Sequence, residues 1–97
     1  MTFKEITEKL ESVIGEQRKF ELLESNYPAY AFGSGIVAYK VNGMVLKLIF
    51  DGRDGEITLL ISPKHARYPR TEFKTIFTGN QQMLFSDSSF LEKAING

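Results

Sequence analysis

Candidate catalytic residues are scarce in this chain, which has one histidine, His65, and no cysteine. The lack of cysteine excludes disulfides, thiolate metal sites and cysteine nucleophiles. A histidine that acts as a general base needs a nucleophile within hydrogen-bond reach and a carboxylate that orients its ring. The sequence assigns no such partners to His65. We therefore predict an exposed loop histidine in a protein that is not an enzyme.

Acidic residues cluster in one short segment, at Asp51, Asp54 and Glu56. Their spacing differs from that of a calcium-binding loop, and Arg53 lies between the two aspartates. Aspartate is common in turns because its side chain binds nearby backbone N–H groups. Residues 33–35 (GSG) are too few for a phosphate-binding loop, and no Gly-Lys-Ser/Thr sequence follows them. We predict no catalytic residue, bound metal, cofactor or small-molecule ligand.

Positive charge gathers in residues 63–74, here called the basic segment. It contains four cations and one acidic residue, Glu72, although the whole chain is neutral with 12 basic and 12 acidic side chains. Aromatic residues alternate with the cations, a pattern that suits binding of phosphates, bases or an acidic protein surface. Such a segment can also serve only to keep an edge strand soluble. The residues predicted to contact a partner are Lys64, His65, Arg67, Tyr68 and Arg70.

Composition predicts one globular domain that spans residues 1–97. Hydrophobic residues make up 42% and charged residues 25%, which is ordinary for a folded protein. Neutrality weakens any role based on bulk charge, such as coating nucleic acid or a membrane surface. The N-terminus lacks the apolar run of a signal peptide, and nothing approaches the roughly 20 apolar residues of a membrane span. The expected location is the cytoplasm.

An amphipathic helix is predicted over residues 3–15. Thr2 and Glu5 have the spacing of a capping box, and Gly15 is typical of a helix end. One stripe of the helix is apolar and consists of Phe3, Ile6, Leu10, Val13 and Ile14. Continuing the helix would place the next apolar residues off this stripe. Residues 18–24 are therefore predicted to form a strand.

The middle of the chain is predicted to form an antiparallel meander. Asn42-Gly43 lies between alternating apolar runs and predicts a type I′ hairpin that joins strands 36–41 and 44–50. One face of this hairpin is apolar and consists of Val37, Tyr39, Val41, Met44, Leu46, Leu48 and Phe50. The other face is expected to be half exposed and consists of Ile36, Ala38, Lys40, Val45, Lys47 and Ile49. The helix is expected to cover the apolar face.

The segments on either side of this hairpin leave two points open. Tyr27-Pro28 ends the preceding element, strand propensity resumes at Tyr30, and Gly33 and Gly35 suggest a bulge or a close backbone approach. The next strand is predicted over residues 56–62. A four-residue loop before it would place its apolar side chains on the face of Phe50. A five-residue loop would place them on the opposite face.

Two further elements complete the expected fold. Residues 71–78 and 81–85 are predicted to form a third hairpin around Gly79-Asn80. Asp87 or Ser88 is expected to cap a short final helix that runs through Ile95. The predicted fold is α+β, with an N-terminal helix packed on a meander of about five or six strands.

The helix capped at Thr2 and the meander FGSGIVAYKVNGMVLKLIFDGRDGEITLLIS resemble small bacterial immunity proteins that neutralise contact-dependent-inhibition and other polymorphic toxins. The resemblance covers size and architecture. It implies a non-enzymatic protein that masks the active site of a cognate toxin. Inhibitors of cationic nucleases are often strongly acidic, whereas this chain is neutral, so a partner would have to be matched by local patches. The alternative hypothesis is a nucleic-acid-binding module that uses the basic segment.

Overall fold

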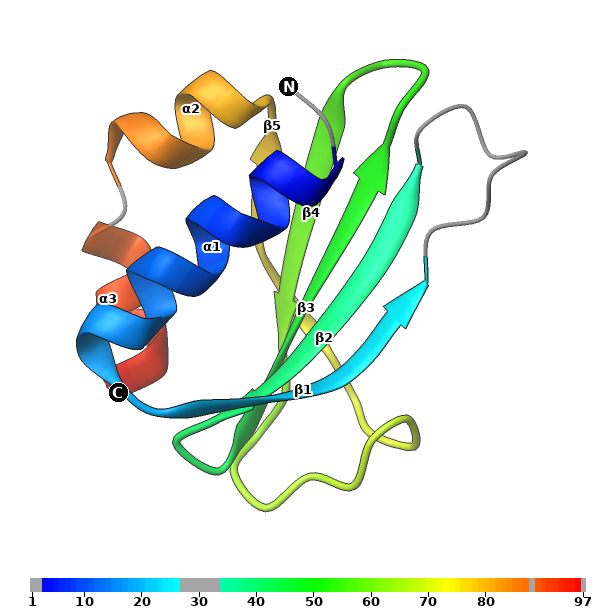
Figure 1. Ribbon diagram of the computed structural model, residues 1–97. Helices are drawn as coiled ribbons and strands as arrows, with labels where there is room; N and C mark the ends of the chain where they lie inside the picture. The colour runs from blue at the N-terminus through cyan, green and yellow to red at the C-terminus, as the bar shows by residue number, and fades with distance from the viewer. Residues whose placement is uncertain (1–2, 27–33, 88, 97) are drawn as a thin grey trace.

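The computed structural model describes residues 3–26, 34–87 and 89–96 of the chain (Figure 1). The elements are, in order, α1 (Phe3–Gln17), β1 (Phe20–Asn26), β2 (Gly35–Val41), β3 (Met44–Asp51), β4 (Glu56–Ile61), β5 (Lys74–Gly79), α2 (Gln81–Ser86) and α3 (Ser89–Asn96). A helix thus precedes a five-stranded sheet, and short helices follow it. This arrangement confirms the predicted α+β fold.

The five strands within the described ranges form one antiparallel sheet in the order β1-β2-β3-β4-β5, which is a meander. The β2–β3 hairpin has the predicted register, with Val41 opposite Met44 and Val37 opposite Leu48. Asn42 and Gly43 have φ values of 50° and 78°, as both central residues of a type I′ turn require. The Asn42-Gly43 turn signal therefore predicted the register of the central pair of strands correctly.

The β3–β4 connection settles the question of loop length. Asp51 pairs with Glu56, so four residues separate the strands. Phe50 and Ile57 are then directly opposite each other and share a face. The apolar side chains of β4 consequently join those of β3 rather than the opposite face.

The three helices of the described residues lie on one face of the sheet, and the hydrophobic core lies between the two layers (Figure 1). Four residues of the predicted α1 stripe are buried, namely Phe3, Ile6, Leu10 and Ile14. They meet the buried side chains of β2, β3 and β4 in one continuous cluster. The other face of the sheet carries no helix among the described residues and is here called the open face.

A close approach, rather than a bulge, explains the glycine at the start of β2. A Cβ added at Gly35 would lie 2.9 Å from the ring of Phe3, nearer than such atoms can pack. Phe3 in turn lies beside Phe50, with ring centroids 6.4 Å apart. Shifts of register occur elsewhere in the sheet, between Leu22 and Glu24 of β1 and between Leu59 and Leu60 of β4.

The prediction of a third hairpin was wrong at its second strand, because residues 81–85 belong to helix α2. Asn80 is the N-cap of this helix, and its side chain accepts a hydrogen bond from the N–H of Met83 at 2.8 Å. Asparagine is among the best N-cap residues. The helix also lets Leu84 reach the core, where it is fully buried. Capping and core burial together outweigh the turn tendency of Gly79-Asn80.

The C-terminal end of α1 is joined to α3 by polar contacts. Helix α1 continues two residues beyond Gly15, and the Gln17 side chain donates to Glu92 of α3 at 3.2 Å. The Arg18 side chain donates to the Asn96 side chain at 2.9 Å. These contacts explain why the helix does not end at its glycine.

The predicted C-terminal helix is present as α3. The Asp87 carboxylate accepts the N–H of Ser89 at 3.0 Å, and this bond lowers the pKa of Asp87. At the other end, the Asn42 side chain donates to the backbone oxygen of Ile95 at 2.7 Å. The β2–β3 turn therefore also satisfies the C-terminus of α3.

Several predictions lie outside the described residues, namely those for Thr2, the Tyr27-Pro28 break, Tyr30, Gly33 and Ser88. Within the described ranges, none of the helices has the length and apolar character that crossing a membrane requires.

Candidate functional site

The basic segment leaves β4, turns below the sheet and returns as β5 (Figure 1). Its start, with the preceding residue Ser62, is bound to the β2–β3 hairpin by hydrogen bonds. Ser62 donates its N–H to Val45 at 2.9 Å, and its Oγ accepts the Val45 N–H at 2.7 Å. His65 donates its N–H to the carbonyl of Gly43 at 2.8 Å. These bonds extend the β3–β4 ladder and hold the first part of the segment in place.

The middle of the segment is held on the open face by Lys47. This lysine lies on β3 between the core residues Leu46 and Leu48, so its side chain points away from the helices. Its Nζ lies 5.8 Å from the ring centroid of Tyr68 and 5.5 Å from that of Phe73. The two rings also meet edge to face, 6.4 Å apart. Such cation–π contacts contribute roughly 0.5–2 kcal/mol each, depending on exposure.

Tyr68 reaches across three strands. Its hydroxyl donates to the carboxylate of Glu24 on β1, while its ring contacts Lys47 on β3. Glu24, Ala38 and Lys47 are consecutive partners across β1, β2 and β3. We infer that the ring lies over Ala38, which is fully buried although it is on the open face.

The expectation of a half-exposed second face was consequently wrong at two residues. Ala38 is covered by Tyr68, and Val45, bound to Ser62, is 2% exposed. On the same face Ile36, Lys47 and Ile49 are half-buried, while Lys40 is exposed. Long-range packing of the basic segment, which strand periodicity does not encode, accounts for the difference.

The predicted contact residues fall into two groups. Lys64, His65, Arg67 and Arg70 are exposed. Tyr68 is half-buried and is committed to contacts with the sheet. Tyr68 therefore anchors the segment that carries the exposed cations.

Arg67 and Arg70 are brought together by a tight turn. They form an antiparallel bridge around Tyr68-Pro69, whose peptide bond is cis. Side chains at directly paired positions leave the backbone on the same side. Two like charges placed in this way repel each other, and an acidic group bound between them would offset that repulsion.

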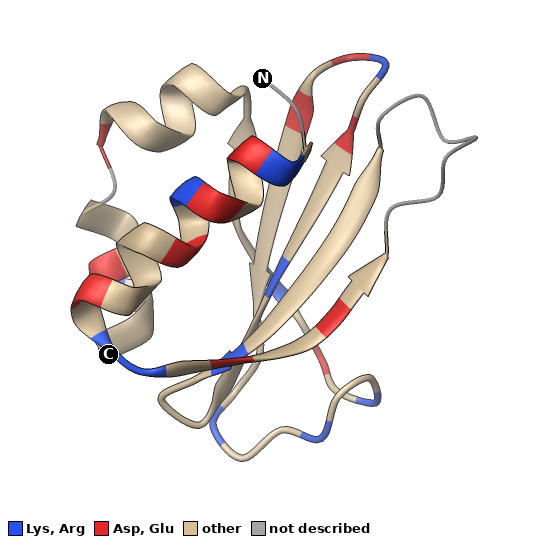
Figure 2. Cartoon of the chain, viewed as in Figure 1, with Lys and Arg blue, Asp and Glu red and all other residues tan. Residues whose placement is uncertain are grey.

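Charge is unevenly distributed over the molecule (Figure 2). Lysine and arginine mark the β4–β5 connection at the lower end of the sheet, whereas acidic residues are frequent along α1. The basic segment has a net charge of +3, from Lys64, Arg67, Arg70 and Lys74 against Glu72. Sequence reasoning did not include Glu24 and Lys47 in the site. The sequence predicted that Lys47 lies on the face of the sheet opposite to the apolar face, but it did not predict the contact between Lys47 and Tyr68.

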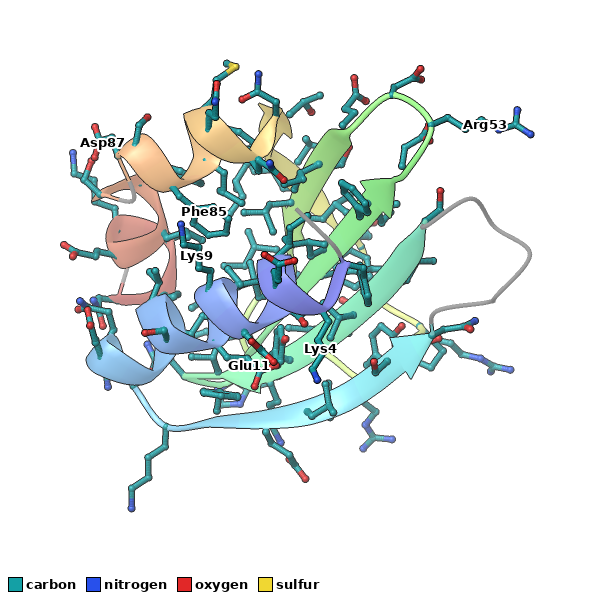
Figure 3. The ribbon with its side chains drawn as sticks, turned by 45° about the horizontal axis from the view of Figure 1, so that its top comes forward. Lys4, Lys9, Glu11, Arg53, Phe85 and Asp87 are labelled. Atoms are coloured by element: carbon teal, nitrogen blue, oxygen red, sulfur yellow. The ribbon has the colours of Figure 1, made fainter. Side chains whose placement is uncertain are left out.

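A tyrosine–carboxylate pair lies on the helical side of the sheet. The hydroxyl of Tyr39 donates to Glu11 of α1 at 2.8 Å, and Figure 3 shows Glu11 on the side of α1 that faces β1. Burial, together with the bond to Glu11, raises the pKa of Tyr39. Perturbed pairs of this kind occur in active sites. Here the tyrosine is completely buried beneath the helix, so the pair serves the packing of α1.

Other surface features are structural or small. Lys9 of α1 lies over the ring of Phe85 in α2, 5.2 Å from its centroid (Figure 3). Across the described residues, no three histidine, aspartate or glutamate side chains are arranged to hold a metal ion. Comparison with known proteins found no matching family model, curated protein or solved structure.

Replacing Tyr68 with alanine is expected to lower the free energy of unfolding by about 2–4 kcal/mol, because Ala38 loses its cover and Lys47 loses a ring contact. Tyr68→Phe keeps the ring and should cost only about 1–2 kcal/mol. Hydrogen exchange at the His65 amide, bound to Gly43 in the folded chain, reports locally on the segment. Unchanged exchange in the alanine variant would show that Tyr68 does not anchor it.

Proposed function

We propose that this protein is a non-enzymatic binding module that holds an acidic surface of a partner protein against its basic segment. The paired arginines 67 and 70 carry this proposal. They are exposed, adjacent and alike in charge. Carboxylates and phosphates both suit such a pair, because guanidinium groups form paired hydrogen bonds with either group. The aromatic contacts described below favour the carboxylates of a protein.

The attachment of the segment supports a binding role. Its cations project from a loop that is held by Ser62, His65, Tyr68 and Phe73. A loop ordered before binding loses less conformational entropy when a partner arrives. Arginine is also among the residues that contribute most to protein interfaces.

The aromatic contacts favour a protein partner over nucleic acid. Single-stranded nucleic acid is held largely by bases stacked on free aromatic rings. Tyr68 and Phe73 contact each other and Lys47, so stacking would compete with the contacts that anchor the segment. An acidic protein surface can instead reach the exposed cations without moving the rings.

The mode of action that we propose is occlusion, as in the immunity proteins that this chain resembles. The protein would cover the active site of a toxin and act in the cytoplasm, with no chemistry of its own. A surface of about 800 Å² on each partner is enough for such a complex. Because the proposed contact is basic, the toxin surface that it covers would be acidic rather than the basic surface of a nuclease.

Reversing three of the exposed cations of the basic segment, Lys64, Arg67 and Arg70, tests this function. The variant Lys64→Glu, Arg67→Glu and Arg70→Glu should lose its partner by at least about tenfold in quantitative capture from source-cell lysate. The matched control is Lys4→Glu, Lys19→Glu and Lys93→Glu, which makes the same charge change at exposed residues elsewhere. This control should retain the partner. Mass spectrometry identifies the captured partner, and the native protein should block the activity of that partner. Equal capture by both variants would contradict the proposal.

A nucleic-acid titration completes this test. A labelled single-stranded oligonucleotide should bind weakly at about 50 mM salt, and three phosphate contacts would give a slope of roughly −2 to −3 in log K against log salt. Submicromolar affinity that persists at about 200 mM salt would favour the nucleic-acid hypothesis instead.

A further inference from the structure

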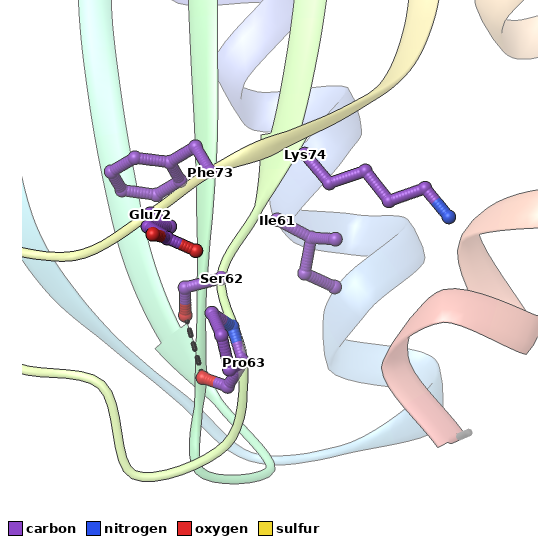
Figure 4. A pocket seen from close by; sticks show the side chains of 6 residues that line it. All are labelled: Ile61, Ser62, Pro63, Glu72, Phe73 and Lys74. Atoms are coloured by element: carbon purple, nitrogen blue, oxygen red, sulfur yellow. Dashed lines mark hydrogen bonds between the residues drawn. The ribbon is translucent and has the colours of Figure 1, made fainter.

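A cleft opens between the two ends of the basic segment, where β4 and β5 separate (Figure 4). Its volume is about 320 Å³. Ile61 and Lys74 are the last paired residues of the two strands, and the chain diverges beyond them. The residues that line the cleft are Ile61, Ser62, Pro63, Glu72, Phe73 and Lys74.

Two of the residues that line this cleft, Ser62 and Phe73, are held in place by contacts within the protein. The Oγ of Ser62 accepts the Val45 N–H and donates to the carbonyl of Pro63 at 2.9 Å, a bond drawn in Figure 4. The ring of Phe73 is fixed by Lys47, whose Nζ lies 5.5 Å from its centroid. A ligand would therefore not have to order this part of the cleft.

The chemistry of the lining points to an apolar side chain. Ile61, Pro63 and Phe73 supply apolar surface, while the hydroxyl of Ser62 is engaged within the protein. The volume is at the lower limit for small-molecule pockets, and the cleft is open to solvent. It suits one large side chain of a bound protein, and such anchors in preformed pockets often dominate an interface.

The surrounding charge defines what flanks that side chain. Lys74 belongs to the cleft itself, and Lys64 and Arg70 belong to the same connection. Glu72 is the one acidic lining residue. We propose that the cleft receives an aromatic or large aliphatic side chain from an acidic segment of the partner. This inference rests on the proposed function and specifies the partner segment that the basic surface selects.

Synthetic peptides test this inference on the complete chain. We choose acetyl-EDFDE-amide, its counterpart with alanine in place of phenylalanine, and acetyl-KKFKK-amide. Nuclear magnetic resonance titrations of the isotope-labelled protein should show the first peptide shifting the amides of Ile61, Ser62, Phe73 and Lys74. The alanine peptide should bind about tenfold more weakly, since it lacks the buried ring. The basic peptide should not bind.

Two substitutions at Glu72 separate an anchor from simple charge attraction. Glu72→Gln removes the one carboxylate of the cleft and should tighten acetyl-EDFDE-amide by about two- to fivefold. Glu72→Trp removes the same carboxylate but also fills the cleft, so it should abolish the preference for phenylalanine over alanine. Glu72 is exposed, and thermal melts confirm that both variants fold.

Any of three results would overturn the anchor cleft. These are equal affinity for the phenylalanine and alanine peptides, matching behaviour of the two Glu72 variants, and absence of binding. The proposed function fails separately, when reversal of the loop cations leaves capture of the partner protein unchanged. Loss of the partner in that variant together with no phenylalanine preference would leave a purely electrostatic interface.

Discussion

Leu46→Ala is expected to lower the free energy of unfolding by about 2–5 kcal/mol. Leu46 is fully buried in the central strand β3, opposite Tyr39 of β2 and Ile61 of β4. Truncation removes apolar contacts and leaves a cavity that the surrounding strands can only partly close. Small proteins are stable by roughly 5–15 kcal/mol in total, so this change removes a large share. Urea unfolding at neutral pH measures it.

Leu22→Ala is the matched control, because it makes the same chemical change at a leucine that is 53% exposed on the edge strand β1. Its expected effect is within about 0.5 kcal/mol of zero. Equal losses in the two variants would mean that the face carrying Leu46 is not the core of the protein in solution.

The central strands were predictable because local rules determine them. Asn42-Gly43 specifies a two-residue turn, and alternation along β2 and β3 then decides which side chains share a face. The loop before β4 was not predictable, since four or five residues are both compatible with its glycines. Only the packing of Ile57 beside Phe50 decides between them.

The error at residues 81–85 shows where local rules conflict. Gly79-Asn80 suits a turn, but asparagine is also a strong helix N-cap. The choice depends on whether Leu84 can be buried, and this requires the core that α1 and the sheet form together. A single sequence gives no measure of that tertiary term.

The candidate site was predictable in composition and unpredictable in arrangement. The charge count identified the basic segment, and its exposed cations could be named. The role of Tyr68 could not be predicted, because it depends on two distant residues. Glu24, which accepts the bond from its hydroxyl, lies 44 residues away in the sequence. Lys47, which contacts its ring, lies on β3. A residue that reads as a free aromatic contact thus anchors the segment.

The native protein is expected to lose stability above about pH 10 because of Tyr39, and Tyr39→Phe should remove this loss. The pKa of Tyr39 is raised above its ordinary value of 10.0, first by burial and then by Glu11. The unfolded chain therefore releases the phenol proton at a lower pH than the folded chain. The stabilisation is complete below about pH 10 and falls by roughly 1.4 kcal/mol for each pH unit above it.

The two proteins should therefore change order of stability with pH. At neutral pH the variant lacks the hydroxyl bond to Glu11 and should be less stable by about 1 kcal/mol. Near pH 11 the curves should cross, because only the native protein pays about 1.4 kcal/mol to keep its phenol neutral. Urea unfolding from about pH 7 to 11.5 measures both curves, and other titrating groups cancel in the difference. Glu11→Gln should keep most of the alkaline loss, since burial is the larger cause. An identical alkaline slope in Tyr39→Phe would mean that water reaches the hydroxyl beneath α1.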